Sequence, residues 1–95
     1  MPYNLSLPQS WLAQGWKAKI RDRERLEPPH VTLIRGRRSW RISLRTGQFL
    51  DDEPDPADVP KDLVDAIAVR FSELHNAWDD MYPENPVQST DAKDE

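Results

Sequence analysis

The chain of 95 residues is predicted to fold as an α+β domain, in which a three- to four-stranded antiparallel β-meander packs on one C-terminal amphipathic α-helix. Apolar and polar residues alternate over residues 16–23 and again over 38–45, and this alternation is typical of strands that bury one face. Between Leu63 and Trp78 the apolar residues recur at helical spacing, which indicates an amphipathic helix. A chain of this length is expected to form a single domain.

Residues 1–15 form an N-terminal segment, for which one helical turn is expected. Pro8 is favoured in the first turn of a helix and Gly15 at its end. The segment has no basic region followed by an apolar run, so no signal peptide is predicted. No stretch of the chain approaches the roughly 18 apolar residues that a membrane span needs. The absence of cysteine favours the reducing cytoplasm as the location.

The predicted α+β domain spans residues 16–82. Its strands are expected at about 16–23, 30–35, 38–45 and 48–50, and its helix at about 60–81. The pair Pro28-Pro29 separates the first two strands because it stops regular structure, and a turn at Thr46-Gly47 leads into the last strand. Pro83 is expected to end the helix. Residues 83–95 are acidic and are predicted to be disordered.

The alternation assigns two apolar rows to the sheet face that meets the helix: Trp16, Ala18, Ile20 and Trp40, Ile42, Leu44. The helical stripe that would cover them consists of Leu63, Ile67, Phe71, Leu74 and Trp78. Burying five such side chains is worth on the order of 10 kcal/mol before chain entropy is subtracted. The helix is therefore expected to pack on the sheet.

Charge is divided unevenly along the chain. Residues 17–50 hold ten Lys or Arg and three acids, which gives +7. Residues 51–95 hold three Lys or Arg and fourteen acids, which gives −11, and the two segments together account for the net charge of −4. Such a division predicts a polarised surface, which either attracts a charged partner or is neutralised within the fold.

The basic side chains are expected to share the sheet face that the helix leaves open. The predicted binding surface consists of Lys17, Lys19, Arg21, Arg35, Arg37, Arg41 and Arg45. Clustered basic residues bind phosphates or acidic proteins. Because Trp16 and Trp40 belong to the apolar rows, this face lacks the exposed aromatic residues on which nucleic-acid bases stack. Contact with a nucleic acid backbone or a protein is the expectation.

Few residues suggest catalysis or metal binding. His30 is a weak candidate for a general base, with Arg35, Arg37 or Arg38 nearby to stabilise a phosphate, but no second acid–base residue is evident. The acidic run from Asp51 to Asp58 lacks the glycine and the closing glutamate of a calcium loop. With two histidines and no cysteine, a zinc site is not expected either. No metal or cofactor is predicted.

Two short motifs resemble those of a known family. The run Glu27-Pro28-Pro29-His30-Val31, the tryptophan-containing strand after it and the segment Leu74-His75-Asn76-Ala77-Trp78 occur in the order seen in the bacterial domain of unknown function 4160 family. These small proteins carry an EPPHVH-type motif and a late L-x-x-A-W segment, and the resemblance covers about residues 25–82. Thr32 stands where the family usually has a second histidine, which weakens any catalytic inference.

The resemblance implies a compact α+β domain with no established activity. It also implies a partner, because these proteins are often encoded beside another small protein in an arrangement similar to toxin–antitoxin pairs. The leading hypothesis is a small bacterial interaction domain, a component of such a module, which binds an acidic partner or a nucleic acid backbone through its basic sheet face.

Two alternatives remain open from the sequence. The first is a ribonuclease-like toxin that uses His30 and nearby arginines. The second is an acidic mimic or adaptor that binds through residues 51–58 and the end of the helix. An open edge strand would in addition allow a homodimer by strand pairing.

Overall fold

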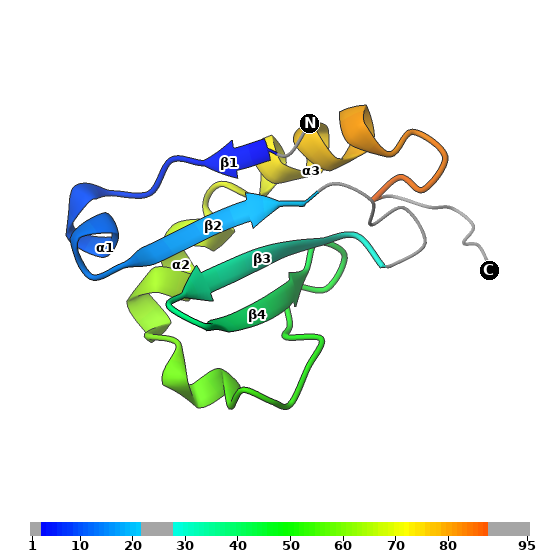
Figure 1. Cartoon of the computed structure of the whole chain (residues 1–95). Coiled ribbons are helices and arrows are strands. Elements are labelled where there is room, and N and C mark those ends of the chain that lie inside the picture. The colour runs from blue at the N-terminus through cyan, green and yellow to red at the C-terminus, as the bar shows by residue number, and fades with distance from the viewer. Residues whose placement is uncertain (1–2, 22–27, 88–95) are drawn as a thin grey trace.

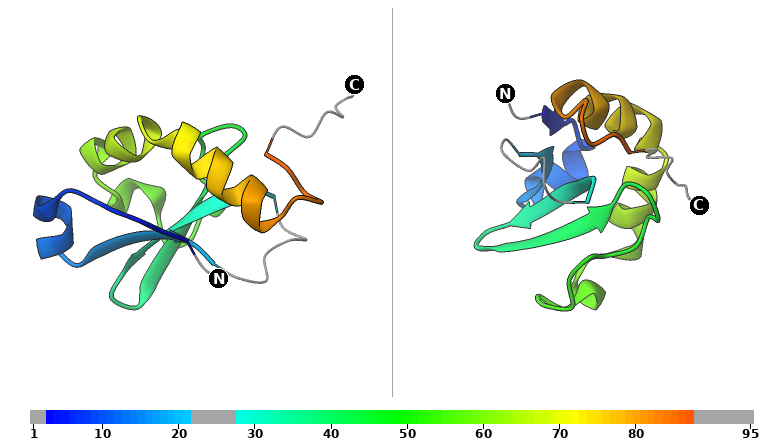
Figure 2. Two further views of the ribbon diagram at one scale, coloured as in Figure 1. Left: turned by 90° about the horizontal axis from the view of Figure 1, so that it is seen from above. Right: turned by 90° about the vertical axis from the view of Figure 1, so that its right-hand side faces the viewer.

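The computed structural model describes residues 3–21 and 28–87, and shows a four-stranded antiparallel sheet with helices on one face (Figure 1). The strands, adjacent in chain order, are β1 (Tyr3–Leu5), β2 (Trp16–Ile20), β3 (His30–Arg35) and β4 (Arg38–Ser43). The helices are α1 (Gln9–Ala13), the 3₁₀ helix η1 (Pro56–Asp58), α2 (Lys61–Ala68) and α3 (Phe71–Met81). Seen from above, α2 and α3 lie together on the same side of the sheet (Figure 2). The predicted α+β fold is confirmed.

The first strand, β1, was not predicted. Tyr3 pairs with Ile20 and Leu5 with Ala18, so β1 extends the sheet beyond β2. Three residues are too few to show an alternating pattern, and only pairing with β2 makes them a strand. The predicted helical turn between Pro8 and Gly15 is confirmed by α1.

The prediction of a strand at 48–50 is wrong. Only one bridge, between Ile42 and Phe49, joins this segment to the sheet. Backbone bonds from Ser43 N to Gln48 O (2.8 Å) and from Leu50 N to Arg41 O (2.8 Å) nevertheless hold it along the outer edge of β4. The chain then turns into the acidic, proline-containing loop before a ladder can form. Strand addition at this part of β4 is therefore blocked, and the outer edge of β1 is the alternative for pairing with a second copy.

The single helix predicted over residues 60–81 is two helices, α2 and α3, which are separated at Val69 and Arg70. A straight helix of that length would measure about 33 Å, whereas strands of six residues measure about 20 Å. The break lets both halves follow the twisted sheet. Arg70 fastens it, because its guanidinium donates to the Ser6 carbonyl (2.6 Å) and to Glu73 Oε1 (2.6 Å).

The core lies between the sheet and the two long helices. Both predicted apolar rows are buried, with every member at most 2% exposed: Trp16, Ala18, Ile20, Trp40, Ile42 and Leu44. From the helices, Leu63, Ile67, Leu74 and Trp78 are fully buried, and Phe71 is partly buried against them. The ring centroids of Trp16 and Trp40 lie 5.4 Å apart, and those of Trp78 and Tyr82 lie 4.3 Å apart. Tryptophan therefore supplies much of the buried surface.

The predicted disorder of residues 83–95 is wrong for residues 83–87. Val87 is buried, and its amide donates to Asp79 Oδ1 (2.8 Å). Trp78 Nε1 donates to the Asn85 carbonyl (2.7 Å). Residues 88–95 lie outside the described part of the chain, as do residues 22 and 23, over which the first strand was expected to continue. Among the described helices, none has the length and apolar character needed to cross a membrane.

The packing of α2 predicts a contrast between two substitutions. Leu63 is fully buried, so Leu63→Ala is expected to lower the free energy of unfolding by about 2–5 kcal/mol. Val69, at the end of the same helix, is 82% exposed, so Val69→Ala should change it by no more than about 0.5 kcal/mol. Urea unfolding followed by tryptophan fluorescence measures both. Equal losses of unfolding free energy in the two variants would show that α2 does not pack on the sheet through the face that carries Leu63.

Candidate anion-binding site

The strand register places a row of polar side chains on the face of the sheet away from α2 and α3. Lys19 lies opposite Thr32, and Thr32 lies opposite Arg41, so the three side chains cross β2, β3 and β4 in one row. Lys17 and Ser39 belong to the same face by alternation. We call the surface formed by Lys17, Lys19, Thr32, Ile34, Ser39 and Arg41 the open face.

Two of the seven predicted binding residues lie elsewhere. Arg35 lies opposite Trp16, covers its ring at 5.4 Å, and donates from Nε to the Gln14 carbonyl (3.1 Å). Arg45 follows the end of β4 and donates from Nε to the Val87 carbonyl (2.8 Å) and from Nη2 to the Pro86 carbonyl (3.0 Å). Both arginines are used to hold the fold together.

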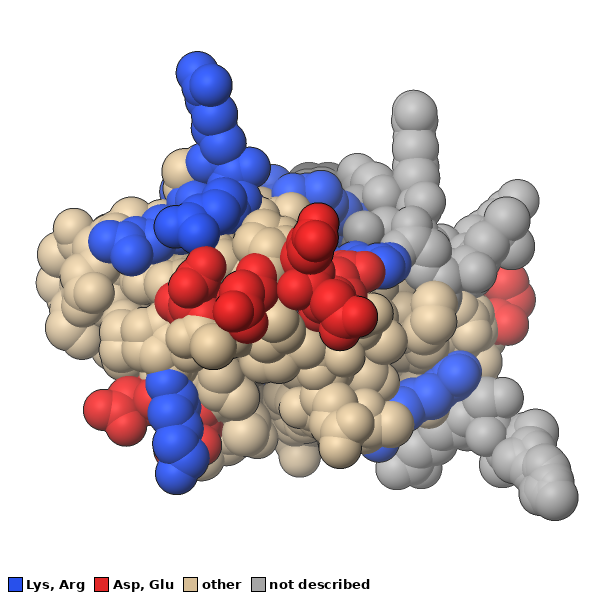
Figure 3. Space-filling view, turned by 90° about the horizontal axis from the view of Figure 1, so that it is seen from below, with Lys and Arg blue, Asp and Glu red and all other residues tan. Residues whose placement is uncertain are grey.

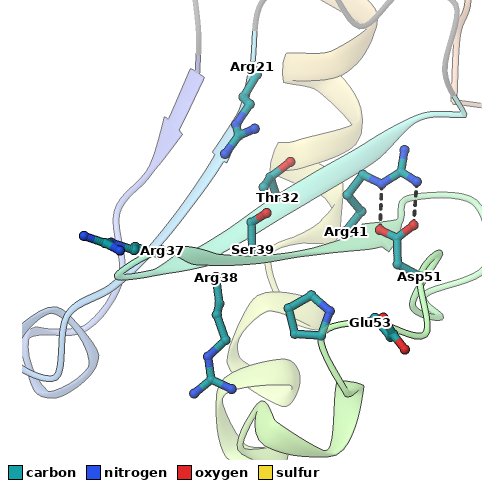
Figure 4. Close-up of a pocket in the computed structure, with 9 residues that line it drawn as sticks. Arg21, Thr32, Arg37, Arg38, Ser39, Arg41, Asp51 and Glu53 are labelled. Carbon is teal, nitrogen blue, oxygen red and sulfur yellow. Dashed lines mark hydrogen bonds and ion pairs between the residues drawn. The ribbon is translucent and has the colours of Figure 1, made fainter.

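A pocket of about 400 Å³ opens beside the row of polar side chains (Figure 4). Its lining consists of Arg21, Thr32, Arg37, Arg38, Ser39, Arg41, Asp51, Glu53 and Pro54. Of the predicted binding residues, it brings together Arg21, Arg37 and Arg41. Arg38 was not among the predicted binding residues. Its guanidinium covers the Trp40 ring at 5.7 Å, and it lines this pocket as well. With four arginines and two acids, the lining carries a net charge of +2.

Arg41 and Asp51 form the strongest ion pair of the pocket. Arg41 Nε donates to Asp51 Oδ2 (2.8 Å) and Arg41 Nη2 donates to Asp51 Oδ1 (2.6 Å), which is the two-pronged geometry that a guanidinium makes with a carboxylate. These hydrogen bonds hold the pKa of Asp51 below its ordinary value, although partial burial opposes the shift. Asp51 therefore stays ionised and remains bound to Arg41.

The acidic loop lies directly beside the basic side chains (Figure 3). Trp40 Nε1 donates to the Asp55 carbonyl (3.1 Å), and Asp55 Oδ1 in turn accepts from the Ala57 amide (2.9 Å). An ion pair between Arg38 and Asp58 (2.9 Å) ties down the end of the loop. Part of the basic surface is therefore neutralised within the fold.

Three other basic side chains are not paired with an acidic residue of the described chain. Lys17, Lys19 and Arg37 form no ion pair or hydrogen bond through their side chains with any part of the described chain. Lys17 and Arg37 are exposed and Lys19 is half-buried. Their positive charge faces solvent at the rim of the pocket and on the adjoining strand β2.

Thr32 is the unusual residue of this site. It lines the pocket although it is only 2% exposed, and its Oγ1 has no hydrogen-bond partner. A buried hydroxyl without a partner costs about 1–3 kcal/mol. The other buried polar side-chain atom without a partner in the described chain is Trp16 Nε1, which lies in the core and lines neither of the two described pockets. Thr32, Ser39 and Arg21 line the same pocket (Figure 4).

His30, the weak candidate for a general base, is fully buried. Its Nδ1 lies 2.8 Å from the Pro28 carbonyl oxygen, and its ring packs beside Trp78 at 5.5 Å. A base must reach the proton that it removes, and this imidazole has no exposed surface. The ribonuclease-like alternative therefore loses its catalytic residue. Among the described residues, no group of three or more His, Asp or Glu is placed to bind a metal ion.

Comparison with known proteins adds no relative: no family model, no curated protein and no solved structure matches this chain. The resemblance to the domain of unknown function 4160 family stays a prediction that depends on the motifs around His30 and Trp78.

The unpartnered hydroxyl predicts an unusual response to substitution. Thr32→Val replaces that hydroxyl by a methyl group of similar size, so the free energy of unfolding should stay the same or rise by about 1 kcal/mol. Ser43 is a matched contrast, because its buried Oγ accepts from the amides of Arg45 (3.1 Å) and Thr46 (3.2 Å). Ser43→Ala should lower the same quantity by about 1–2 kcal/mol. Urea unfolding checks both, and a clear loss of stability for Thr32→Val would mean that the hydroxyl does have a partner.

The Arg41–Asp51 pair predicts a dependence of stability on pH. The pKa of Asp51 is lower in the folded than in the unfolded state, so the pair stabilises the fold above the unfolded pKa of about 4 and loses its effect as the pH falls through the folded value. Asp51→Asn should therefore be less stable than the parent at pH 7, by no more than about 1 kcal/mol, and should equal it near pH 2. Asp52→Asn, at an exposed neighbour, is the control. A constant difference from pH 7 to pH 2 would contradict the pair's contribution.

Proposed function

We propose that this protein is a small interaction domain that binds an acidic segment of a partner protein through its open face. The observation that carries the proposal is the group Lys17, Lys19 and Arg37, whose charges have no acid within the described chain to neutralise them. Unpaired positive charges on one surface attract anionic partners over several ångströms and accelerate their association.

The surroundings of these charges favour a protein over a nucleic acid. Duplex DNA carries one negative charge per about 1.7 Å along its axis, and the four strands span only about 15–20 Å. A longer polyanion would pass from the open face onto the acidic loop and be repelled by Asp52, Glu53 and Asp55. A short acidic segment, flanked by basic residues of its own, would complement both regions.

The composition of the open face supports the same choice. No aromatic side chain belongs to it, so it offers no platform on which single-stranded bases could stack. Carboxylates match the guanidinium group in geometry, as Asp51 demonstrates on Arg41. The family resemblance suggests where the partner would be found, namely in a small protein encoded by a neighbouring gene.

A charge reversal at the rim tests this function. Arg37→Glu is expected to weaken binding to the short acidic peptide hexa-L-glutamate and to the neighbouring gene's product about fivefold at low salt, because it changes the charge at the rim of the open face by two. Lys61→Glu, an equal change at an exposed position on α2, should leave both affinities unaltered. Fluorescence anisotropy at two salt concentrations measures the binding.

Two outcomes of that titration would overturn the proposal. One is equal weakening by Arg37→Glu and Lys61→Glu, which would indicate that only net charge matters. The other is preferential binding of a six-residue oligothymidine over hexa-L-glutamate, which would favour the nucleic acid backbone as the ligand.

A further inference from the structure

We propose that the pocket beside Thr32 is a binding site for a phosphate monoester, with Thr32 Oγ1 as a hydrogen-bond donor in its wall. The inference deepens the proposed function and rests on it for the source of the group, which we take to be a phosphorylated serine or threonine within the acidic segment of the partner. A free phosphomonoester shares this chemistry, and the experiment below separates the two sources.

The charge of the pocket favours an anion. Its lining holds four arginines and two acids, but Arg41 is paired with Asp51 and Arg38 is paired with Asp58 at 2.9 Å. Arg37 forms no ion pair within the described chain, and a phosphate monoester, with a charge of about −1.5 to −2 at pH 7, would attract it more strongly than a carboxylate or a phosphodiester with one negative charge. The pocket volume of about 400 Å³ leaves room for the tetrahedral group and the atoms that attach it to a side chain.

The donors of the pocket come from several directions. Thr32 lies on β3, Ser39 on β4, Arg37 in the turn between them, and Arg21 just beyond β2. A phosphate group offers three terminal oxygens that accept hydrogen bonds, whereas a carboxylate offers two oxygens in one plane. Donors spread around a hollow therefore suit the tetrahedral group better. Figure 4 shows the Thr32 and Ser39 side chains on the same side of the sheet as Arg21.

The unpartnered hydroxyl is the observation that points to a ligand. Thr32 lines the pocket, and its Oγ1 is buried without a hydrogen-bond partner. The free energy lost by removing this hydroxyl from water is therefore not offset by a hydrogen bond within the protein. A bound anion would accept its hydrogen bond. A water molecule could do the same, but it would leave the positive charge of Arg37 unneutralised at the pocket wall.

Asp51 behaves as an internal competitor for this ligand. Its carboxylate occupies the Nε and Nη2 donors of Arg41, and phosphates bind arginine in the same two-pronged way. A phosphate that enters the pocket would therefore gain Arg41 only if Asp51 moved aside. Removing the charge of Asp51 should increase the affinity for phosphate.

The experiment is a titration of the ¹⁵N-labelled full chain at pH 7.5 with phenyl phosphate, followed by the amide shifts of Thr32, Ser39 and Arg41. Thr32→Val is expected to weaken binding about tenfold, since a hydrogen bond to a charged oxygen is lost. Asp51→Asn should strengthen it about fivefold, and Asp65→Asn, at an exposed position on α2, should leave it unchanged. Because Thr32→Val is expected to keep the stability of the parent, which urea unfolding checks, a loss of affinity would not reflect unfolding. Unchanged affinity in Thr32→Val would overturn the site and point to water alone beside the hydroxyl.

Further ligands identify the source of the group. A phosphoserine peptide with flanking glutamates should bind more tightly than phenyl phosphate if the group belongs to a partner protein, whereas equal affinities would indicate a free phosphomonoester. Dimethyl phosphate should bind at least tenfold more weakly, and equal binding would overturn the assignment to a monoester. Binding of hexa-L-glutamate without binding of phenyl phosphate would reject this pocket alone and leave the proposed function intact.

Discussion

The rings of Trp16 and Trp40 lie side by side between the sheet and its helices, and the arrangement of the molecule depends on their burial. Both belong to strands in which every second residue is apolar, so sinking these rings against α2 and α3 fixes which face of the sheet each remaining side chain must occupy. Lysines, arginines and hydroxyls are thereby collected on the opposite face. The basic surface is a consequence of the same alternation that builds the core.

That basic surface would repel itself without the loop of residues 51–58. The loop is anchored through Trp40 Nε1, a core residue, and places Asp51 and Asp58 on Arg41 and Arg38. Packing and electrostatics are thus coupled, because a side chain of the core decides where the acids lie. The compensation is incomplete, since Lys17, Lys19 and Arg37 receive no acid from the described chain. An external anion would therefore be attracted most strongly to these three positive charges.

Thr32 illustrates how a local conflict can indicate function. Threonine suits a strand, and its position next to Lys19 and Arg41 follows from the pairing of β2, β3 and β4. Its burial without a hydrogen bond serves no structural purpose, in contrast to Ser43, whose buried hydroxyl holds two backbone amides of the following turn. Local rules are broken most often at functional sites. Within the described chain, Thr32 is the residue that combines such a conflict with a pocket and with unpaired charge.

The sequence by itself determined the features that repeat along the chain. Alternation located β2 and β4, a run of β-favouring residues located β3, and helical spacing located the stripe from Leu63 to Trp78. Both apolar rows are buried as predicted. These signals are readable because each depends on neighbours a few residues away. The presence of a basic open face followed from the same pattern.

Only the tertiary structure decided what depends on distant partners. β1 exists because it pairs with β2, and the break between α2 and α3 is held by Arg70, whose side chain donates to the Ser6 carbonyl. Arg45 left the predicted surface to hold residues 86 and 87, and His30 left the candidate site for the core. The charges of Arg41 and Asp51 could be counted in the sequence. That these two residues form an ion pair is visible only in the folded chain. The composition indicated that acidic residues could neutralise the basic face. The tertiary structure determines that Asp51 pairs with Arg41 and Asp58 with Arg38, because it sets the position of the loop relative to the sheet.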